Sequence, residues 1–310
     1  MDRAFQKLYE IVKEEVLKNA HGMAVANKMV PCSGTRKKLP LTGREIEIVY
    51  YAAKSENQPL IVGYHGGGFV FGGCALDDAM WKAVAETLDV NVASVGYRMS
   101  PDYQWKETLD DSYEALLYLA SHAEEFGFDG THLSVMGQSA GGNLAAAVSL
   151  LVNREQSVKL DNIILLYPFL DVATDPQEKG PGSLEGPICN VMNDLHCSEE
   201  VRKDPLVSPV YATSDMLSGL PNTILNYCED DNLRSEAVRY GEMLKAAKVP
   251  VAEHLSEGMP HAYFESGFKK PTEFEINNTL GKNGPQIIED GSLFRAAREC
   301  LEFIKENFVR

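Results

Sequence analysis

Short apolar segments alternate with helical segments along most of the chain, and this alternation limits the fold more than any other feature. Helical periodicity marks Asp77–Leu88, Thr108–His122, Ser139–Arg154, Arg234–Ala247 and Ser292–Asn307. The predicted strands are Pro59–Tyr64, Asn91–Tyr97, His132–Met136, Asn162–Tyr167, Asn222–Cys228 and Val249–Leu255. Strands that alternate with helices predict a mostly parallel sheet flanked by helices on both faces. We therefore expect an α/β fold.

Segments outside this alternation predict how the rest of the chain is organised. Residues 3–19 have apolar side chains at helical spacing, and residues 45–52 predict another strand. Residues 172–208 are rich in Pro, Gly, Asp and Met and show no clear period. Long aperiodic insertions in compact domains often form lids. We expect a single domain over residues 1–310, with 1–35 and 172–208 as cap or lid elements.

Charge and composition exclude several classes of partner. The net charge is −16, which repels nucleic acid and anionic lipid headgroups. The chain has no run of 18 apolar residues that would predict a membrane span, and no apolar N-terminal region typical of a signal peptide. The 6 cysteines form no CxxC pair, so we expect free thiols and a cytoplasmic location. We expect no cofactor and no metal, and a homo-oligomer remains compatible with the sequence.

Ser139 stands at the centre of a G-x-S-x-G motif. Gly137 and Gly141 flank it, and Gln138 precedes it directly. The motif follows a predicted strand and opens a predicted helix, which is the context of a nucleophile elbow. A serine that only caps an ordinary strand–helix turn is the alternative. The strand before it and the helix after it favour the elbow.

A glycine-rich loop offers a second part of the same chemistry. His65 is followed by Gly66, Gly67 and Gly68 directly after a predicted strand. Backbone N–H groups in such a loop can approach a substrate closely and stabilise an oxyanion. We predict Gly67, Gly68 and Ala140 as the N–H donors, with His65 and Gly66 supporting the loop. No lysine follows as a phosphate loop requires, the dinucleotide-binding pattern fails at its last glycine, and a purely structural turn is the remaining alternative.

A serine nucleophile needs a base, and the chain order of this fold is Ser, then Asp or Glu, then His. Of the seven histidines in the chain, three come after Ser139, as this order requires: His196, His254 and His261. His196 lies in the aperiodic insertion, and His254 lies within a predicted strand. His261 lies in a loop shaped by glycine and proline, so we predict His261 as the base.

The acid is expected in the loop after the strand that ends at Cys228. Glu229, Asp230 and Asp231 follow in succession. We rank Asp231 first, Asp230 second and Glu229 third. The role of this acid would be to hold the imidazole of the base in one tautomer and to stabilise the imidazolium. Each of these acids could instead cap the helix that begins near Arg234.

Six motifs in order give the chain a specific likeness. It resembles the hormone-sensitive-lipase-like esterases, an α/β-hydrolase family with an HGGG-type oxyanion loop. The resemblance covers about residues 59–265 and implies the α/β-hydrolase fold, Ser139 as nucleophile, Asp231 as acid and His261 as base. The matching segments are His65–Gly68, Gly96–Pro101, Gly137–Gly142, Asp204–Pro209, Asp231–Arg234 and Gly258–His261.

The resemblance also has consequences and departures. It implies Gly67, Gly68 and Ala140 as oxyanion donors, and it favours Asp231 over Asp230. Most relatives carry Asp where this chain has Gln138. The N-terminal segment is short for the family, so residues 172–208 would have to supply much of the lid.

These observations predict a serine hydrolase that cleaves short-chain carboxylic esters through an acyl-enzyme intermediate. The partner is then a small-molecule ester. An amidase, an aryl-formamidase or a peptidase could use the same triad, because fold and triad do not determine the leaving group. A non-catalytic ligand-binding protein on the same scaffold is a third reading, which the presence of His261 disfavours.

Overall fold

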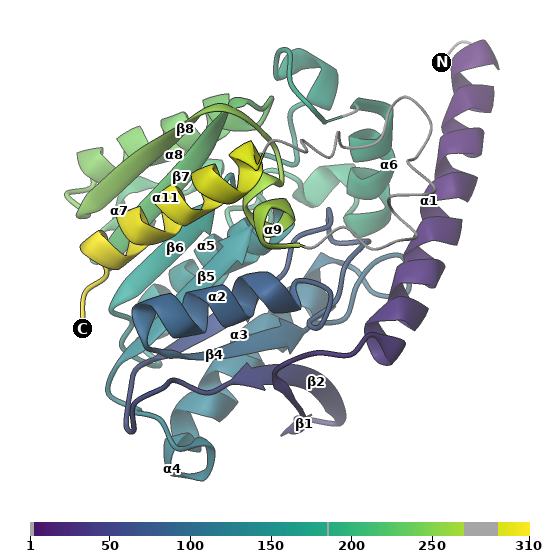
Figure 1. Cartoon of the computed structure of the whole chain (residues 1–310). Helices are drawn as coiled ribbons and strands as arrows, with labels where there is room; N and C mark the ends of the chain where they lie inside the picture. The colour runs from purple at the N-terminus through teal and green to yellow at the C-terminus, as the bar shows by residue number, and fades with distance from the viewer. Residues whose placement is uncertain (1–2, 185, 270–290) are drawn as a thin grey trace.

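The computed structural model describes residues 3–184, 186–269 and 291–310. A central eight-stranded sheet lies between two layers of helices (Figure 1). The strand order is β1-β2-β4-β3-β5-β6-β7-β8. From β4 onward the neighbours run parallel, and β1 and β2 form an antiparallel edge. This architecture confirms the expected mostly parallel α/β fold.

The central strands are buried on both faces, as their apolar sequences require. Every residue of β3, β5 and β6 is buried. The eight strands are β1 (Thr35–Leu41), β2 (Arg44–Tyr51), β3 (Leu60–Tyr64), β4 (Asn91–Gly96), β5 (Leu133–Gln138), β6 (Asn162–Leu166), β7 (Asn222–Asp230) and β8 (Val251–Pro260).

Two of these strands differ from the prediction. The sequence does not predict β1, because its first half is polar and only Leu39 and Leu41 are buried. The strand expected to end at Leu255 continues as β8 to Pro260, which pairs with Asp230 beyond an irregularity in β7. His261 therefore follows the strand directly instead of lying within a longer loop.

Helices cover both faces of the sheet and close two apolar cores (Figure 1). One face carries α2 (Asp78–Leu88), α9 (Tyr263–Phe268) and α11 (Ser292–Asn307). The other carries α3 (Trp105–Ser121), α5 (Ala140–Glu155) and α8 (Arg234–Ala246). The short helices α4 (Ala123–Phe126) and α7 (Ser214–Leu217) complete this layer.

Two further helices pack on each other beyond the sheet. α1 (Arg3–Met29) runs ten residues past the predicted end of the N-terminal helix, and it lies against α6 (Gly186–His196) in Figure 1. Residues 172–208 were expected to be aperiodic, but they contain α6. A small apolar core joins the two helices to the loop after β3, through Val16, Ala20, Val70, Val191 and Met192.

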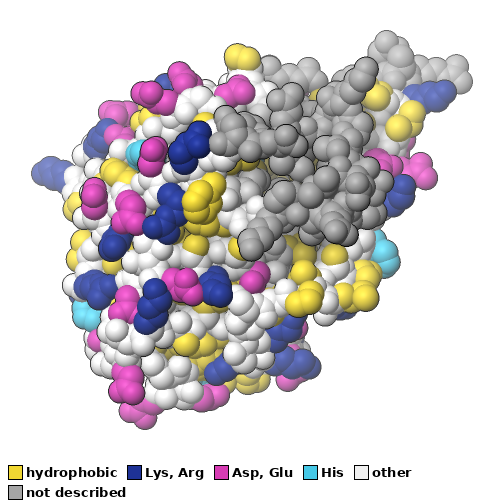
Figure 2. Space-filling view, viewed as in Figure 1, with side chains coloured by type: hydrophobic (Ala, Val, Ile, Leu, Met, Phe, Trp, Pro, Cys, Tyr) yellow, Lys and Arg dark blue, Asp and Glu magenta, His cyan; other side chains and the backbone are white. Residues whose placement is uncertain are grey.

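The surface of the described residues mixes both signs of charge. On the face seen in Figure 2, acidic and basic side chains are interspersed and do not gather into one basic surface. Among the helices that the structure describes, none is long and apolar enough to cross a membrane.

Candidate active site

Ser139 occupies the tight turn between β5 and α5. Its backbone has φ 54° and ψ −120°, a conformation that costs a non-glycine residue about 1–3 kcal/mol. The flanking glycines make the turn possible. A Cβ at Gly137 would lie 2.0 Å from the carbonyl oxygen of Gly141, and a Cβ at Gly141 would lie 1.9 Å from that of Tyr64. The motif therefore forms the elbow that its sequence predicts.

Three side chains, each directly after the end of β5, β7 or β8, form one hydrogen-bonded series. Ser139 Oγ lies 2.8 Å from Nε2 of His261, and Nδ1 of His261 lies 2.7 Å from Oδ2 of Asp231. Asp231 Oδ1 also accepts a hydrogen bond from the backbone N–H of Leu233 at 3.0 Å. All three distances fall within the normal range for hydrogen bonds. The series has the geometry that proton transfer from Ser139 requires.

The electrostatics of this series favour a basic imidazole. Burial by itself lowers the pKa of His261, but the charge of Asp231 and its hydrogen bond outweigh that effect, so the pKa is raised. The edge of the Tyr167 ring packs against His261, with centroids 5.0 Å apart. The N–H of His261 donates to Ser183 Oγ at 3.0 Å, which ties the residue to the 172–208 segment.

The other candidates for acid and base lie elsewhere. Glu229 accepts a hydrogen bond from the N–H of Gly258 at 2.8 Å, and Asp230 is exposed. His196 stacks on Phe69 with ring centroids 3.8 Å apart. His254 stacks on Phe303 at 4.9 Å. None of these four contacts Ser139 among the hydrogen bonds of the described residues.

The glycine loop lies beside Ser139 and is shaped by buried hydrogen bonds. Gly67 and Gly68 have φ values of 113° and 61°, which favour glycine over any side chain. The carbonyl oxygen of Gly67 accepts from the N–H of Phe71 at 2.8 Å. Both glycines line the same cavity as Ser139. The N–H of Ala140 stands at the start of α5, where the backbone donors lack intrahelical acceptors.

His65 supports this loop and does not reach the cavity. It is buried, and its Nδ1 lies 2.8 Å from the carbonyl oxygen of Gly66. The hydroxyl of Tyr97 donates to the His65 carbonyl at 2.6 Å, and the two rings stack with centroids 4.2 Å apart. Burial lowers the pKa of His65, which keeps the ring neutral.

Gln138 is also a supporting residue. Its side chain is fully buried, and Nε2 donates to Oδ2 of Asp77 at 2.9 Å. The other Asp77 oxygen pairs with Nζ of Lys269 at 3.0 Å. Gln138 therefore links β5 to the segment before α2, and it does not line the cavity.

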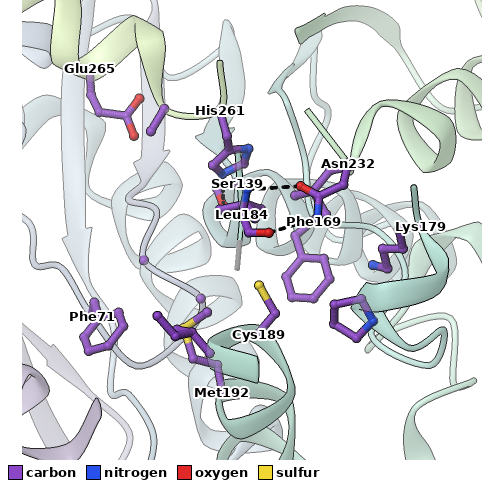
Figure 3. A pocket seen from close by; sticks show the side chains of 16 residues that line it. Phe71, Ser139, Phe169, Lys179, Leu184, Cys189, Met192, Asn232, His261 and Glu265 are labelled. Carbon is purple, nitrogen blue, oxygen red and sulfur yellow. Dashed lines mark hydrogen bonds between the residues drawn. The ribbon is translucent and has the colours of Figure 1, made fainter. Parts of the chain in front are cut away.

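The cavity has a volume of about 290 Å³ and opens beside Ser139 and His261 (Figure 3). Its walls are mainly apolar, and the segment 172–208 supplies 6 of its 16 wall residues. Three polar side chains, those of Lys179, Asn232 and Glu265, were not predicted as site residues. The apolar lining comes mainly from Phe71, Phe169, Pro176, Leu184, Ile188, Cys189, Met192 and Leu233.

The lining residues of segment 172–208 were not predicted, because sequence reasoning found no clear period there and so missed α6, which carries Ile188, Cys189 and Met192. Glu265 lies only four residues after His261, so its place near that side chain was open to inference from the sequence. Within residues 3–184, 186–269 and 291–310, no cluster of three or more His, Cys, Asp or Glu side chains could hold a metal ion.

Comparison with known proteins adds an independent line of observation. The sequence profile of a family described as alpha/beta hydrolase fold matches residues 61–265. The chain is 31% identical to an arylesterase of Saccharolobus solfataricus, over 76% of this chain and 79% of that protein. It is 29% identical to carboxylesterase NlhH of Mycobacterium tuberculosis, over 76% of each. The crystal structure of a thermostable carboxylesterase cloned from a metagenomic library superimposes with a TM-score of 0.74 at 27% identity, covering 96% of this chain and 97% of that one.

Proposed function

Because the chain belongs to the alpha/beta hydrolase family, we propose that it hydrolyses carboxylic esters, with Ser139 as nucleophile, His261 as base and Asp231 as the acid that orients the base. The observation that carries the proposal is the series of two hydrogen bonds, of 2.7 and 2.8 Å, from Asp231 through His261 to Ser139. The names of the relatives, an arylesterase and a carboxylesterase, support the same reaction.

The reaction proceeds in two halves around His261. Nε2 takes the proton of Ser139 as Oγ bonds to the ester carbonyl carbon, and the carbonyl oxygen becomes an oxyanion. The intermediate collapses, the bond to the alcohol oxygen breaks, and His261 gives its proton to the departing alkoxide. Water then attacks the acyl-enzyme while His261 accepts one of its protons. Ser139 leaves with that proton, and the carboxylic acid is released.

The oxyanion is proposed to bind to the N–H groups of Gly67, Gly68 and Ala140. These donors suit the role because two lie in a loop without side chains at the cavity wall and the third begins α5. The N-terminus of α5 adds a partial positive charge at the same point. Each such donor contributes on the order of 10²–10³-fold to turnover.

We propose short acyl chains, from acetyl to butyryl, as the preferred substrates. A cavity of about 290 Å³ is at the lower end of the range for small-molecule sites. A long acyl chain would have to displace α6 or extend into solvent.

We also propose one catalytic domain over residues 1–310, with residues 1–35 and 172–208 acting together as the cap. The contact between α1 and α6 through Val16, Ala20 and Met192 supports this arrangement. A Cβ on Gly68 would lie 2.3 Å from the Met192 sulfur, so α6 lies directly over the glycine loop. The small core between the helices is the part that an opening movement would break.

A cytoplasmic location is part of the same proposal. All 6 cysteines are free thiols, and 5 of them are buried. Free thiols are typical of proteins in reducing compartments.

Turnover of p-nitrophenyl acetate by Ser139→Ala tests the function. We expect at least a ~10³-fold loss relative to the parent protein. Ser218→Ala, which alters an exposed serine far from the cavity, serves as the matched control and should retain full activity. Covalent labelling by a fluorophosphonate should occur in the parent and the control only. Equal turnover in the parent and Ser139→Ala would reject the proposal, and an unlabelled parent would favour a binding protein on this scaffold.

A further inference from the structure

Besides Ser139 and His261, three polar side chains line the cavity, and two of them are hydrogen-bonded to other parts of the protein. Lys179 donates to the carboxylate of Glu236 at 2.6 Å and to the carbonyl oxygen of Asp171 at 2.5 Å. Asn232 exchanges hydrogen bonds of 3.2 and 3.3 Å with the backbone of Leu184. Both side chains therefore help to hold segment 172–184 in place.

Glu265 differs from them because part of its carboxyl group remains available. It lies on α9, four residues after His261, and it lines the cavity. The hydroxyl of Tyr167 donates to Oε2 of Glu265. A carboxylate accepts about four hydrogen bonds, so this contact uses only part of its capacity. In Figure 3 the carboxyl group points toward the middle of the cavity, on the side of Ser139 opposite Lys179.

The surroundings of Glu265 limit what it can bind. Burial raises its pKa, and the charge of Asp77 raises it further, while Lys269 and the Tyr167 hydroxyl act in the opposite direction. An anionic group on a substrate would be repelled by the Glu265 carboxyl group and by the nearby charge of Asp77. A hydroxyl group both donates and accepts, so it can pair with this carboxyl group whether or not the carboxyl carries a proton.

From this geometry we infer that Glu265 is a specificity-determining residue of the site, and that it binds a hydroxyl group on the acid or alcohol part of the ester. The inference rests on the proposed function, because it concerns which esters the same cavity accepts. The enzyme should favour esters of hydroxylated acids or alcohols over esters of the same shape without the hydroxyl. An apolar ester would displace water from the free part of the Glu265 carboxyl group without offering a hydrogen bond in its place, and this is the physical reason for the preference.

Two pairs of esters of matched shape test this inference. Methyl 3-hydroxybutyrate and methyl isovalerate place or remove the hydroxyl on the acid part. 2-Hydroxyethyl acetate and propyl acetate do so on the alcohol part. The measured quantity is the ratio of kcat/KM within each pair, followed by acid release in a pH-stat. Any change in Ser139 or His261 reactivity affects both members equally and cancels in the ratio.

Three variants are compared with the parent protein. Glu265→Met keeps an unbranched side chain of similar length but removes the hydrogen-bonding group, and we expect the ratio to fall at least tenfold in one pair. Glu265→Gln still donates and accepts hydrogen bonds, and it should retain most of the preference. Glu178→Gln removes an exposed carboxyl group one residue before Lys179 and should keep the parental ratio.

Each outcome decides a separate point. If the ratio falls in Glu265→Met and is kept in Glu265→Gln, the inference stands, and the affected pair tells which part of the ester lies against α9. If the apolar esters are hydrolysed but neither ratio changes in Glu265→Met, the inference is wrong while the proposed function survives. The same holds if the parent protein shows no preference in either pair. If no ester is hydrolysed in a Ser139-dependent manner, the proposed function itself fails, and the inference falls with it.

Discussion

The contact between Asp231 and His261 gives the most specific prediction for the proposed mechanism. In the proposed mechanism His261 becomes an imidazolium in the transition state, and the Asp231 carboxylate lies 2.7 Å from its Nδ1. Because the positive charge is spread over the ring, an effective separation of about 4 Å is appropriate, and at an effective dielectric constant of about 20 the attraction is about 4 kcal/mol. Each 1.36 kcal/mol corresponds to a tenfold change in rate. Asp231→Asn should therefore lower kcat by about 10³-fold.

The pH profile of the same variant provides a second readout. His261 must be neutral to accept the serine proton, and the charge of Asp231 raises its pKa. In Asp231→Asn this cause is absent and burial lowers the pKa instead. The acidic limb of kcat/KM against pH should therefore move to lower pH, which a loss of folding would not produce.

Asp230→Asn is the matched control because it removes a carboxylate at the neighbouring, exposed position. Turnover of p-nitrophenyl acetate by this variant should stay within about twofold of the parent, as expected for a surface change. The reasoning would be refuted if Asp231→Asn kept more than a tenth of the parental kcat. It would also be refuted if the two variants lost activity equally.

Three further predictions concern the glycine loop, the cavity and a buried acid. Gly67→Ala should abolish most esterase activity and lower the melting temperature, because its Cβ would lie 2.3 Å from the backbone oxygen of Phe71. Gly68→Ala should have a smaller effect, because its Cβ would meet the flexible Met192 side chain. With p-nitrophenyl esters, kcat/KM should peak between two and four acyl carbons, and a peak at ten or more would contradict the cavity size. Burial raises the pKa of Glu236 to about 7, so the folded state binds the proton more tightly than the unfolded state. The free energy of unfolding, measured with denaturant, should therefore fall as the pH rises from about 4.5 to about 7. The fall should be larger in the parent protein than in Glu236→Gln, by up to about 3 kcal/mol. An equal pH dependence in the two proteins would refute this.

Local sequence patterns predicted the parts of the site that depend on backbone geometry. The tight turn at Ser139 needs Gly137 and Gly141, because a Cβ at either would lie about 2 Å from a backbone oxygen. The glycine loop needs positive φ angles at Gly67 and Gly68. Such requirements exclude almost every other residue, so they leave a readable mark in the sequence.

The choice among neighbouring acids needed more than local pattern. Glu229, Asp230 and Asp231 all carry a carboxyl group and follow one another directly after the predicted strand, so the sequence alone does not distinguish their roles. The register between β7 and β8, with its irregularity between Cys228 and Asp230, decides which side chain turns toward His261. The resemblance to a known family favoured Asp231, and the structure places Asp231 within hydrogen-bond distance of His261.

By itself, the sequence determined the alternating sheet architecture, the strained turn and the order of the reactive groups, because periodicity and glycine geometry act over a few adjacent residues. Only the tertiary structure decided the continuation of α1, the pairing of polar β1, and the walls of the cavity. Those walls come from α6, α9 and segment 172–184, whose side chains meet through packing between distant parts of the chain. The burial of Lys179 and Glu265 in the cavity wall arises from that packing, so no local pattern could specify it.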